Sequence, residues 1–274
     1  IFIDDPANTN TPSTFIDGAK CVLERAQTNL AGNVVTLNGG TLILNNTIFK
    51  SIDACEGMWD GIEVQGCPNA PQQIITSPPF SIKTQARLIV NTGSIIQDAY
   101  FGAANYEFDL TNSDYQNYFK TSTLQSGGII IGTANSTFKN NHVGVCFMPY
   151  FNSNVASNFK NTHFLIDAPL KNALIKPDAM ALLNDTKVLS FKSCVFLNSA
   201  TLTYPIVPVA PNPIIVHGIL SYNSSFSISS SVLAATIPYG SGCSFENLTY
   251  GIKAFNSTVN TALVQSSNFY NNYR

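Results

Sequence analysis

A short recurring block of residues is the feature that most constrains the fold of this chain. In the stretch 135–150, NSTFKNNHVGVCFMPY, a small polar residue stands two positions before a phenylalanine, and an asparagine stands two positions after it. A glycine and an alternating apolar segment follow. The same order returns in 242–255, GCSFENLTYGIKAF, and in part in 266–274, 193–199, 162–164 and 46–51. Repetition of one short unit indicates a fold made of stacked copies of a supersecondary element.

The large residues of these blocks align as one series, and a small residue precedes each of them by two positions. The large residues are Phe49, Ile96, Phe138, Phe164, Phe196, Phe226, Phe245 and Phe269, and the small ones are Thr47, Ser94, Ser136, Thr162, Cys194, Ser224, Cys243 and Ser267. Positions i, i+2 and i+4 of a strand lie on one face. We therefore predict an inward face of small and large residues, followed in most units by Asn or a similar residue at a turn.

Short apolar segments separated by Asn and Gly turns run from residue 34 to the end of the chain. Strands this short, in units of this size, predict an all-β fold, a parallel β-helix (solenoid) of about eight coils. Loop excursions interrupt it at 67–80, 104–126, 168–187 and 204–213, and the third of these is compatible with a short helix broken by Pro177. An antiparallel β-sandwich is the competing interpretation, but the NG-type hairpins that it requires are scarce.

The two ends of the chain differ in pattern. Residues 1–33 are irregular, with a helix-compatible stretch within 15–31, and we expect this segment to cap the stack. The repeat region spans 34–274. Its last unit stops part-way, which predicts that the β-helix continues beyond the C-terminal end of this chain into other parts of the same long protein.

Composition argues against several classes of partner. Charged residues make up 11% of the chain, against about 25% in ordinary soluble domains. The formal net charge is −2, so no basic field exists to attract nucleic acid. No apolar run approaches the ~20 residues of a membrane-spanning helix, and we therefore expect no membrane insertion.

The six cysteines are Cys21, Cys55, Cys67, Cys146, Cys194 and Cys243. None forms a CxxC pair and the chain has three histidines, so we expect neither a metal site nor a cofactor. Cys55 and Cys67 bracket the single tryptophan and are the candidate pair for a disulfide in an oxidising compartment. The alternative is that the cysteines are small buried apolar residues.

The segment 55–66, CEGMWDGIEVQG, together with 94–99 and 138–145, resembles the right-handed parallel β-helix repeats of secreted proteins, a group shared with pectate lyases. More narrowly, it resembles β-helix regions of large cell-surface proteins from Bacteroidetes, which carry a Met-Trp-x-Gly-Ile segment and Phe-x-Asn-Asn units. The resemblance covers residues 34–274 and implies a right-handed fold and a secreted or cell-surface location. It says little about function, because β-helices host lyases, hydrolases, adhesins and stalks.

The best candidates for polysaccharide chemistry are the acidic residues Asp60, Glu63 and Asp98, with Arg87 between them in the chain. Hydrolysis needs two carboxylates at a working separation. Asp98 occupies a position that other units fill with Asn, which favours a turn residue, and Glu63 alternates outward from a strand. No second acidic row follows in later units, so we expect no catalytic site. The three histidines, His142, His163 and His217, share no register and are interpreted as ordinary turn or surface residues.

Aromatic residues supply the candidate ligand contacts. Trp59 could stack on a sugar ring or pack at a corner of the coil, and packing is the favoured interpretation. The excursion at 104–126 carries Tyr106, Tyr115 and Tyr118, and long loops on a rigid scaffold commonly bind ligands.

The sequence thus favours a non-catalytic extracellular β-helix section of a larger cell-surface protein, serving as a stalk, adhesin or filament component. The alternative is a carbohydrate-active enzyme or carbohydrate-binding module of the pectate-lyase-like group. The expected partners are a polysaccharide or another surface protein.

Overall fold

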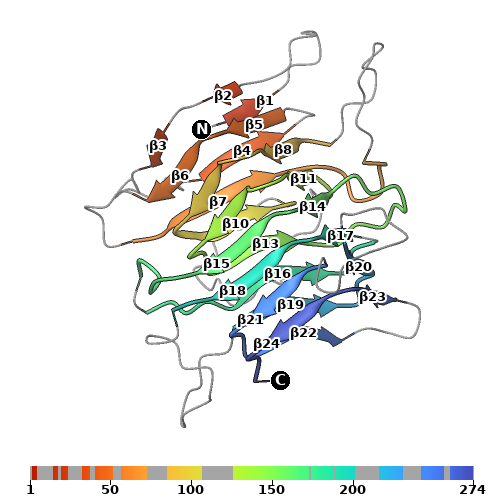
Figure 1. Ribbon diagram of the computed structural model, residues 1–274. Helices are drawn as coiled ribbons and strands as arrows, with labels where there is room; N and C mark the ends of the chain where they lie inside the picture. The colour runs from red at the N-terminus through yellow and green to blue at the C-terminus, as the bar shows by residue number, and fades with distance from the viewer. Residues whose placement is uncertain are drawn as a thin grey trace.

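The fold is seen in a computed structural model (Figure 1). It describes residues 2–4, 15–17, 20–23, 33–37, 41–51, 57–72, 85–106, 126–172, 174–187, 189–200, 216–230, 242–255 and 260–273. Within these ranges the chain forms strands and turns and contains no helix. The strands are short, as the Asn and Gly punctuation of the sequence predicts.

The strands form three sheets of eight strands each in the described part of the chain. Sheet A contains β1 (Phe2–Asp4), β4 (Asn33–Leu37), β7 (Trp59–Val64), β10 (Ala99–Ala104), β13 (Val143–Phe147), β16 (Ala179–Asn184), β19 (His217–Tyr222) and β22 (Tyr250–Phe255). Sheet B contains β2 (Phe15–Asp17), β5 (Thr41–Asn45), β8 (Arg87–Val90), β11 (Ile129–Gly132), β14 (Asn158–Lys160), β17 (Leu189–Lys192), β20 (Phe226–Ser229) and β23 (Ala262–Val264). Sheet C contains β3 (Lys20–Leu23), β6 (Ile48–Ser51), β9 (Ile95–Gln97), β12 (Thr137–Lys139), β15 (His163–Ile166), β18 (Val195–Asn198), β21 (Ser244–Glu246) and β24 (Asn268–Tyr270).

The chain visits the three sheets in turn, so every third strand in the sequence lies next to its predecessor in a sheet. In Figure 1 the strands accordingly stack from the N-terminal red end to the C-terminal blue end. The pairings between described strands are parallel, for example Phe138 with Phe164 and Phe164 with Phe196. This topology is all-β and consistent with a parallel β solenoid. The antiparallel sandwich is wrong, because it requires hairpin pairs of opposite direction.

A column of aromatic rings fills the interior behind sheet C. Phe138, Phe164, Phe196, Phe245 and Phe269 occupy equivalent positions on successive strands, with Phe49 and Ile96 earlier in the same ladder. The ring planes are nearly parallel, with centroids 4.8 Å apart for Phe164 and Phe196 and 4.6 Å for Phe196 and Phe245. This column confirms seven of the eight predicted large anchors.

Phe226 is the exception to the predicted series. It lies on β20 in sheet B, where it pairs with Leu189 and Ala262, and not in the sheet C ladder. The small-x-large spacing of Ser224 and Phe226 is the same as in the ladder because another corner of the chain is built in the same way. At that corner Asn223 has φ 46° and the Ser224 hydroxyl accepts the N–H of Thr186 at 3.0 Å.

Single residues in the left-handed conformation make the turns. Between sheets B and C, φ is 47° at Asn46, 60° at Asn135, 50° at Asn161 and 51° at Ser193, and the small residue of the repeat follows each of them. Between sheets C and A, φ is 60° at Asp98, 51° at Asn140, 56° at Asn247 and 50° at Asn271. Asn and Asp tolerate this conformation better than most residues, which explains why the repeat places them after the large residue.

The predicted role of Asn at the turn is divided between two neighbouring residues. Asn140 adopts the left-handed conformation. The next residue, Asn141, donates its amide N–H to the carbonyl of Ile96 at 3.0 Å and accepts the N–H of Ala99 at 2.9 Å. Asn272 repeats this pattern with Phe245 and Leu248. The amides therefore satisfy backbone groups of the adjacent turn instead of bonding to one another in a ladder.

The glycine of the repeat lets the backbone of sheet A approach the aromatic column. A Cβ atom on Gly144 would lie 2.4 Å from the carbonyl oxygen of Met180, and one on Gly251 would lie 2.7 Å from a ring carbon of Phe269. Both separations are too short for a side chain. The glycine in the FKNNHVG block is thus required by packing between neighbouring strands.

Neither of the two predicted helical stretches contains a helix within its described residues. Within 15–31, the described residues form β2 and β3, which end sheets B and C, and β1 likewise ends sheet A. Within 168–187, the described residues form turns and β16. The strand β16 pairs on both sides within sheet A, which outweighs the helix propensity of its Ala and Leu residues. That the segment 1–33 caps the stack stays a prediction.

Loss of one ring from the middle of the column should be costly. Phe138 is 2% exposed and lies between paired residues of the two neighbouring strands, β9 and β15, whereas Phe269 is 49% exposed. We expect Phe138→Ala to lower the free energy of unfolding by about 3–5 kcal/mol, the usual range for a buried phenylalanine, and Phe269→Ala to cost less than half as much. Urea unfolding of the two variants measures both losses, and equal losses would contradict the interior position of the column.

Candidate functional site

Sheet A differs from the other two sheets because both of its faces are buried over much of its length. Every described side chain of β7, β10 and β13 is buried, whereas β5, β6 and β8 alternate between buried and half-buried positions. The inner face joins the core between the three sheets. The outer face joins a second apolar cluster, which we call the outer layer: Met58, Tyr100, Phe101, Ala104, Tyr106, Val143, Cys146, Met148, Leu170, Ala179, Leu182 and Leu220.

Met148 and Leu170, which lie on the connections that follow β13 and β15, pack in the outer layer, and the outer face of sheet A continues onto β19 and β22. There a group of polar and aromatic side chains reaches the surface. We call it the sheet A patch: Asp178, His217, Tyr222, Tyr250, Lys253 and Phe255. Phe255 is 50% exposed, whereas His217 is 6% exposed and lies at the buried edge of the patch. The patch is the part of the outer face where a ligand can reach several different side chains.

The register of β19 and β22 creates two columns of stacked rings in the patch. His217 pairs with Tyr250, and their ring centroids lie 5.3 Å apart at an interplanar angle of 14°. Tyr222 pairs with Phe255, with centroids 5.1 Å apart at 11°. Lys253 stands between the columns, and its Nζ atom lies 4.6 Å from the Tyr250 centroid and 5.2 Å from that of Phe255. Both distances fall within the range of cation–π attraction.

Asp178 supplies the acidic group of the patch. The Nδ1 atom of His217 lies 3.0 Å from the carbonyl oxygen of Asp178 and 3.5 Å from its carboxylate oxygen Oδ1. The Nε2 atom of the same imidazole is buried and has no hydrogen-bond partner among the described residues. Burial raises the pKa of Tyr222, and the nearby charge of Asp178 raises it further, so the phenol stays protonated at neutral pH.

The predicted acidic candidates do not converge on one site. Asp60 and Glu63 lie on β7 in sheet A and are 4% and 3% exposed, whereas Arg87 lies on β8 in sheet B. Glu63 accepts a hydrogen bond from Gln65 at 2.9 Å. Asp98 lies at the turn between β9 and β10, where its carboxylate accepts a hydrogen bond from Gln97 at 2.9 Å. The buried carboxylates of β7 and the turn carboxylate of Asp98 are thus tied to local neighbours.

The predicted aromatic ligand contacts lie in different environments. Trp59 is 1% exposed, packs edge-on against Phe49 at 6.2 Å and donates its indole N–H to the carbonyl of Gln97 at 2.7 Å. This position corresponds to the packing interpretation. Tyr106 is 2% exposed and packs against Phe101 in the outer layer. Tyr115 and Tyr118 lie outside the described residues, so their role in binding stays a prediction.

The predicted disulfide is also left open. Cys67 is half-buried and is not bonded to another described cysteine, and Cys55 lies outside the described residues. The two other histidines are separate from the patch. His142 contacts the carbonyl of Lys176 through Nδ1, and burial lowers its pKa. His163 lies on β15 in sheet C.

The sheet A patch is not predicted from the sequence, because its residues come together only through the register of two strands that are separated in the chain. The segment 250–255, YGIKAF, carried a usable signal: Tyr250, Lys253 and Phe255 are aromatic or charged, while Ile252 between them packs against the core. Its partner His217 was interpreted as an ordinary turn or surface residue and instead begins β19.

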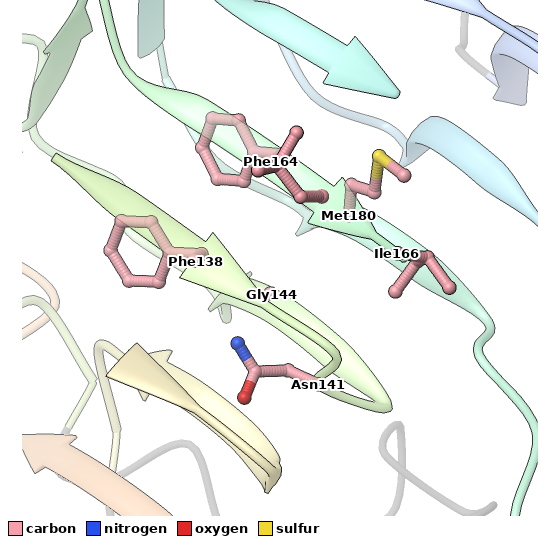
Figure 2. Close-up of a pocket in the computed structure, with 7 residues that line it drawn as sticks. Phe138, Asn141, Gly144, Phe164, Ile166 and Met180 are labelled. Atoms are coloured by element: carbon pink, nitrogen blue, oxygen red, sulfur yellow. The ribbon is translucent and has the colours of Figure 1, made fainter. Parts of the chain in front are cut away.

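A small cavity lies between sheets C and A, lined by Phe138, Asn141, Gly144, Phe164, Leu165, Ile166 and Met180 (Figure 2). Its volume of about 10 Å³ has room for about one water molecule. Figure 2 shows the rings of Phe138 and Phe164 on neighbouring strands and the amide of Asn141 beside Gly144. This cavity belongs to the turn described above and has no room for a substrate.

In comparisons with known proteins, no protein-family model, no curated protein and no solved structure matches the chain. Within the described ranges, no three His, Cys, Asp or Glu side chains are grouped to hold a metal ion. The same ranges contain no helix of the length and apolarity that crossing a membrane requires.

The buried carboxyl of Asp98 gives a prediction for stability against pH. Burial raises its pKa above the ordinary value of 3.8, although the hydrogen bond from Gln97 opposes this shift. The folded state then binds the proton more tightly than the unfolded state does, so stability is lost as the pH rises from 3.8 through the raised pKa. We expect Asp98→Asn to remove this loss and to be more stable than the unmodified chain at pH 7.

Thermal unfolding between pH 3 and pH 7 measures the effect. Asparagine occupies the equivalent left-handed positions 140, 247 and 271, so the exchange introduces no backbone strain. Asp185→Asn is a matched control, because Asp185 is also a left-handed turn residue, with φ 48°. An Asp98→Asn variant that is less stable than the unmodified chain at pH 7 would show that the Asp98 carboxylate stabilises the turn.

Proposed function

We propose that this chain is a non-catalytic section of a right-handed parallel β-helix of about eight coils in a larger exported protein, where it serves as a stalk, adhesin or filament component. The observation that carries the proposal is the stacking of strand on strand along all three sheets, with equivalent residues paired from turn to turn in sheet C. Such stacking propagates a rigid rod along one direction, which is what a stalk or filament requires.

The handedness is inferred from a general rule, and the coil number is inferred from the number of strands in each sheet. Connections between parallel strands of one sheet are right-handed in about 98% of known cases. Each sheet has eight strands in the described part of the chain, which supports about eight coils. The low charge and the Asn-, Ser- and Thr-rich sequence fit an exported location, and the expected partners are a polysaccharide, another surface protein and other parts of the same long chain.

The absence of turnover is the direct test of this function. The purified chain is incubated with acidic and neutral polysaccharides, with and without calcium, and new chain ends are measured. We expect none, because Asp60 and Glu63 are buried on sheet A and Arg87 lies on another sheet. New ends that disappear in the Glu63→Gln variant would establish a carbohydrate-active enzyme and overturn the scaffold function.

Carbohydrate binding is a second candidate function, and the sheet A patch favours it. Aromatic faces bind the apolar faces of sugar rings, while charged side chains hydrogen-bond to hydroxyl groups. Tyr222, Tyr250 and Phe255 supply the rings, and Lys253 and Asp178 supply the charged groups. A scaffold that carries such a patch would act as an adhesin.

Binding to an immobilised panel of neutral and acidic oligosaccharides tests this candidate. If a glycan binds, we expect Tyr250→Ala to weaken its affinity about tenfold, the effect of losing one aromatic contact of ~1.4 kcal/mol. Tyr270→Ala is the matched control, because Tyr270 is 54% exposed on β24 in sheet C and outside the patch. Equal loss in both variants, or no binding by the unmodified chain, would rule out the patch as the site.

A further inference from the structure

The column of small residues at the corner between sheets B and C brings side-chain γ atoms of consecutive turns together. The hydroxyl oxygens of Ser136 and Thr162 lie 3.1 Å apart although they belong to neighbouring strands of the stack. In the same column, the N–H of Thr47 donates to the hydroxyl of Ser94 at 3.3 Å. The column is buried, so these γ atoms meet without intervening solvent.

Two consecutive members of this column are cysteines. Cys194 directly precedes β18 and Cys243 directly precedes β21, and the two strands pair in register from Val195 and Ser244 onward. Both cysteines are 0% exposed. The N–H of Cys194 donates to the Sγ atom of Cys243 at 3.2 Å. The thiols therefore take the places that hydroxyl groups hold elsewhere in the column.

The spacing suits a covalent bond. A disulfide requires Cα atoms about 4.4–6.8 Å apart, and neighbouring strands of a sheet are separated by about 4.8 Å. In-register pairing of β18 and β21 therefore places the two cysteines at a separation within this range. The other described cysteines lie outside this column: Cys67 is on a loop, Cys146 is on sheet A, and Cys21 is on β3, where it pairs with Phe49 at the position of the large residues.

We propose that Cys194 and Cys243, which are free thiols in this structure, form a disulfide bond between consecutive turns when the chain folds in an oxidising compartment. The setting rests on the exported location proposed above. The two thiols lose two protons and two electrons as the S–S bond forms. A small-molecule disulfide or a protein dithiol–disulfide oxidant accepts the electrons and is itself reduced to two thiols. Because the folded column is closed to solvent, the bond forms during folding.

The bond would cross-link neighbouring layers of the stack. It joins residues 49 positions apart, and closing a loop of this length restricts the unfolded chain. It also prevents β18 and β21 from separating, which strengthens sheet C along the direction in which a stalk carries load.

Oxidative refolding tests the proposal on the whole chain. The protein is refolded in a mixture of reduced and oxidised glutathione, and a parallel sample is refolded with reductant alone. Peptide mapping should identify a Cys194–Cys243 link in the oxidised sample, with a mass lower by two hydrogens. The oxidised sample should unfold several degrees higher than the reduced one.

Single serine variants separate the bond from a packing effect. Serine and threonine occupy the same column at other turns, so Cys194→Ser and Cys243→Ser should fold and should lose the dependence of unfolding temperature on the oxidant. Cys67→Ser, outside the column, should keep the Cys194–Cys243 link. A folded, oxidised chain in which both thiols remain free, or in which Cys194 is joined to a different cysteine, would overturn the proposal. A depolymerase activity would overturn the scaffold function but would leave this result unchanged.

Discussion

In-register pairing of parallel strands is the constraint on which the whole structure depends. Each described strand hydrogen-bonds to strands that come three places earlier or later in the chain, so equivalent positions of the repeat are placed directly above one another. Once this register is set, the identity of a residue at one turn decides what its neighbour can be. Phenylalanines on neighbouring strands stack with nearly parallel rings, as Phe164 and Phe196 do at a centroid distance of 4.8 Å, and a glycine is required where the next strand comes too close for a Cβ atom. The repeat in the sequence follows from these packing requirements.

The covering of sheet A determines where function can reside. Two-sided burial removes β7, β10 and β13 from contact with a ligand, and it places Tyr106 and Trp59 inside the protein. It also leaves the aromatic and charged side chains of β19 and β22 as the accessible part of the same face. The candidate site is thus the place where described aromatic and charged side chains of this face are half-buried or exposed.

The sequence was sufficient for the features that repeat locally and insufficient for those that depend on register across loops. The spacing of Phe138, Asn140 and Gly144 lies within one unit, so the aromatic column and the left-handed turns could be predicted. Phe226 could not be assigned to its sheet, because two corners of the chain use the same small-x-large spacing. The pairing of His217 with Tyr250 depends on how many residues the intervening loops contain, and the local pattern does not indicate that number.

The left-handed turns have a consequence for how such a chain can change. Where Asn46, Asn135 and Asn247 lie, one left-handed residue makes the corner, and this corner does not depend on the length of the connection elsewhere in the same unit. The connection between β10 and β11 is much longer than that between β13 and β14, yet β11 pairs in register with both β8 and β14. Insertions at these connections can therefore accumulate while the axial rise stays constant. A chain of this kind is a framework on which surface loops diversify independently of the core that holds them.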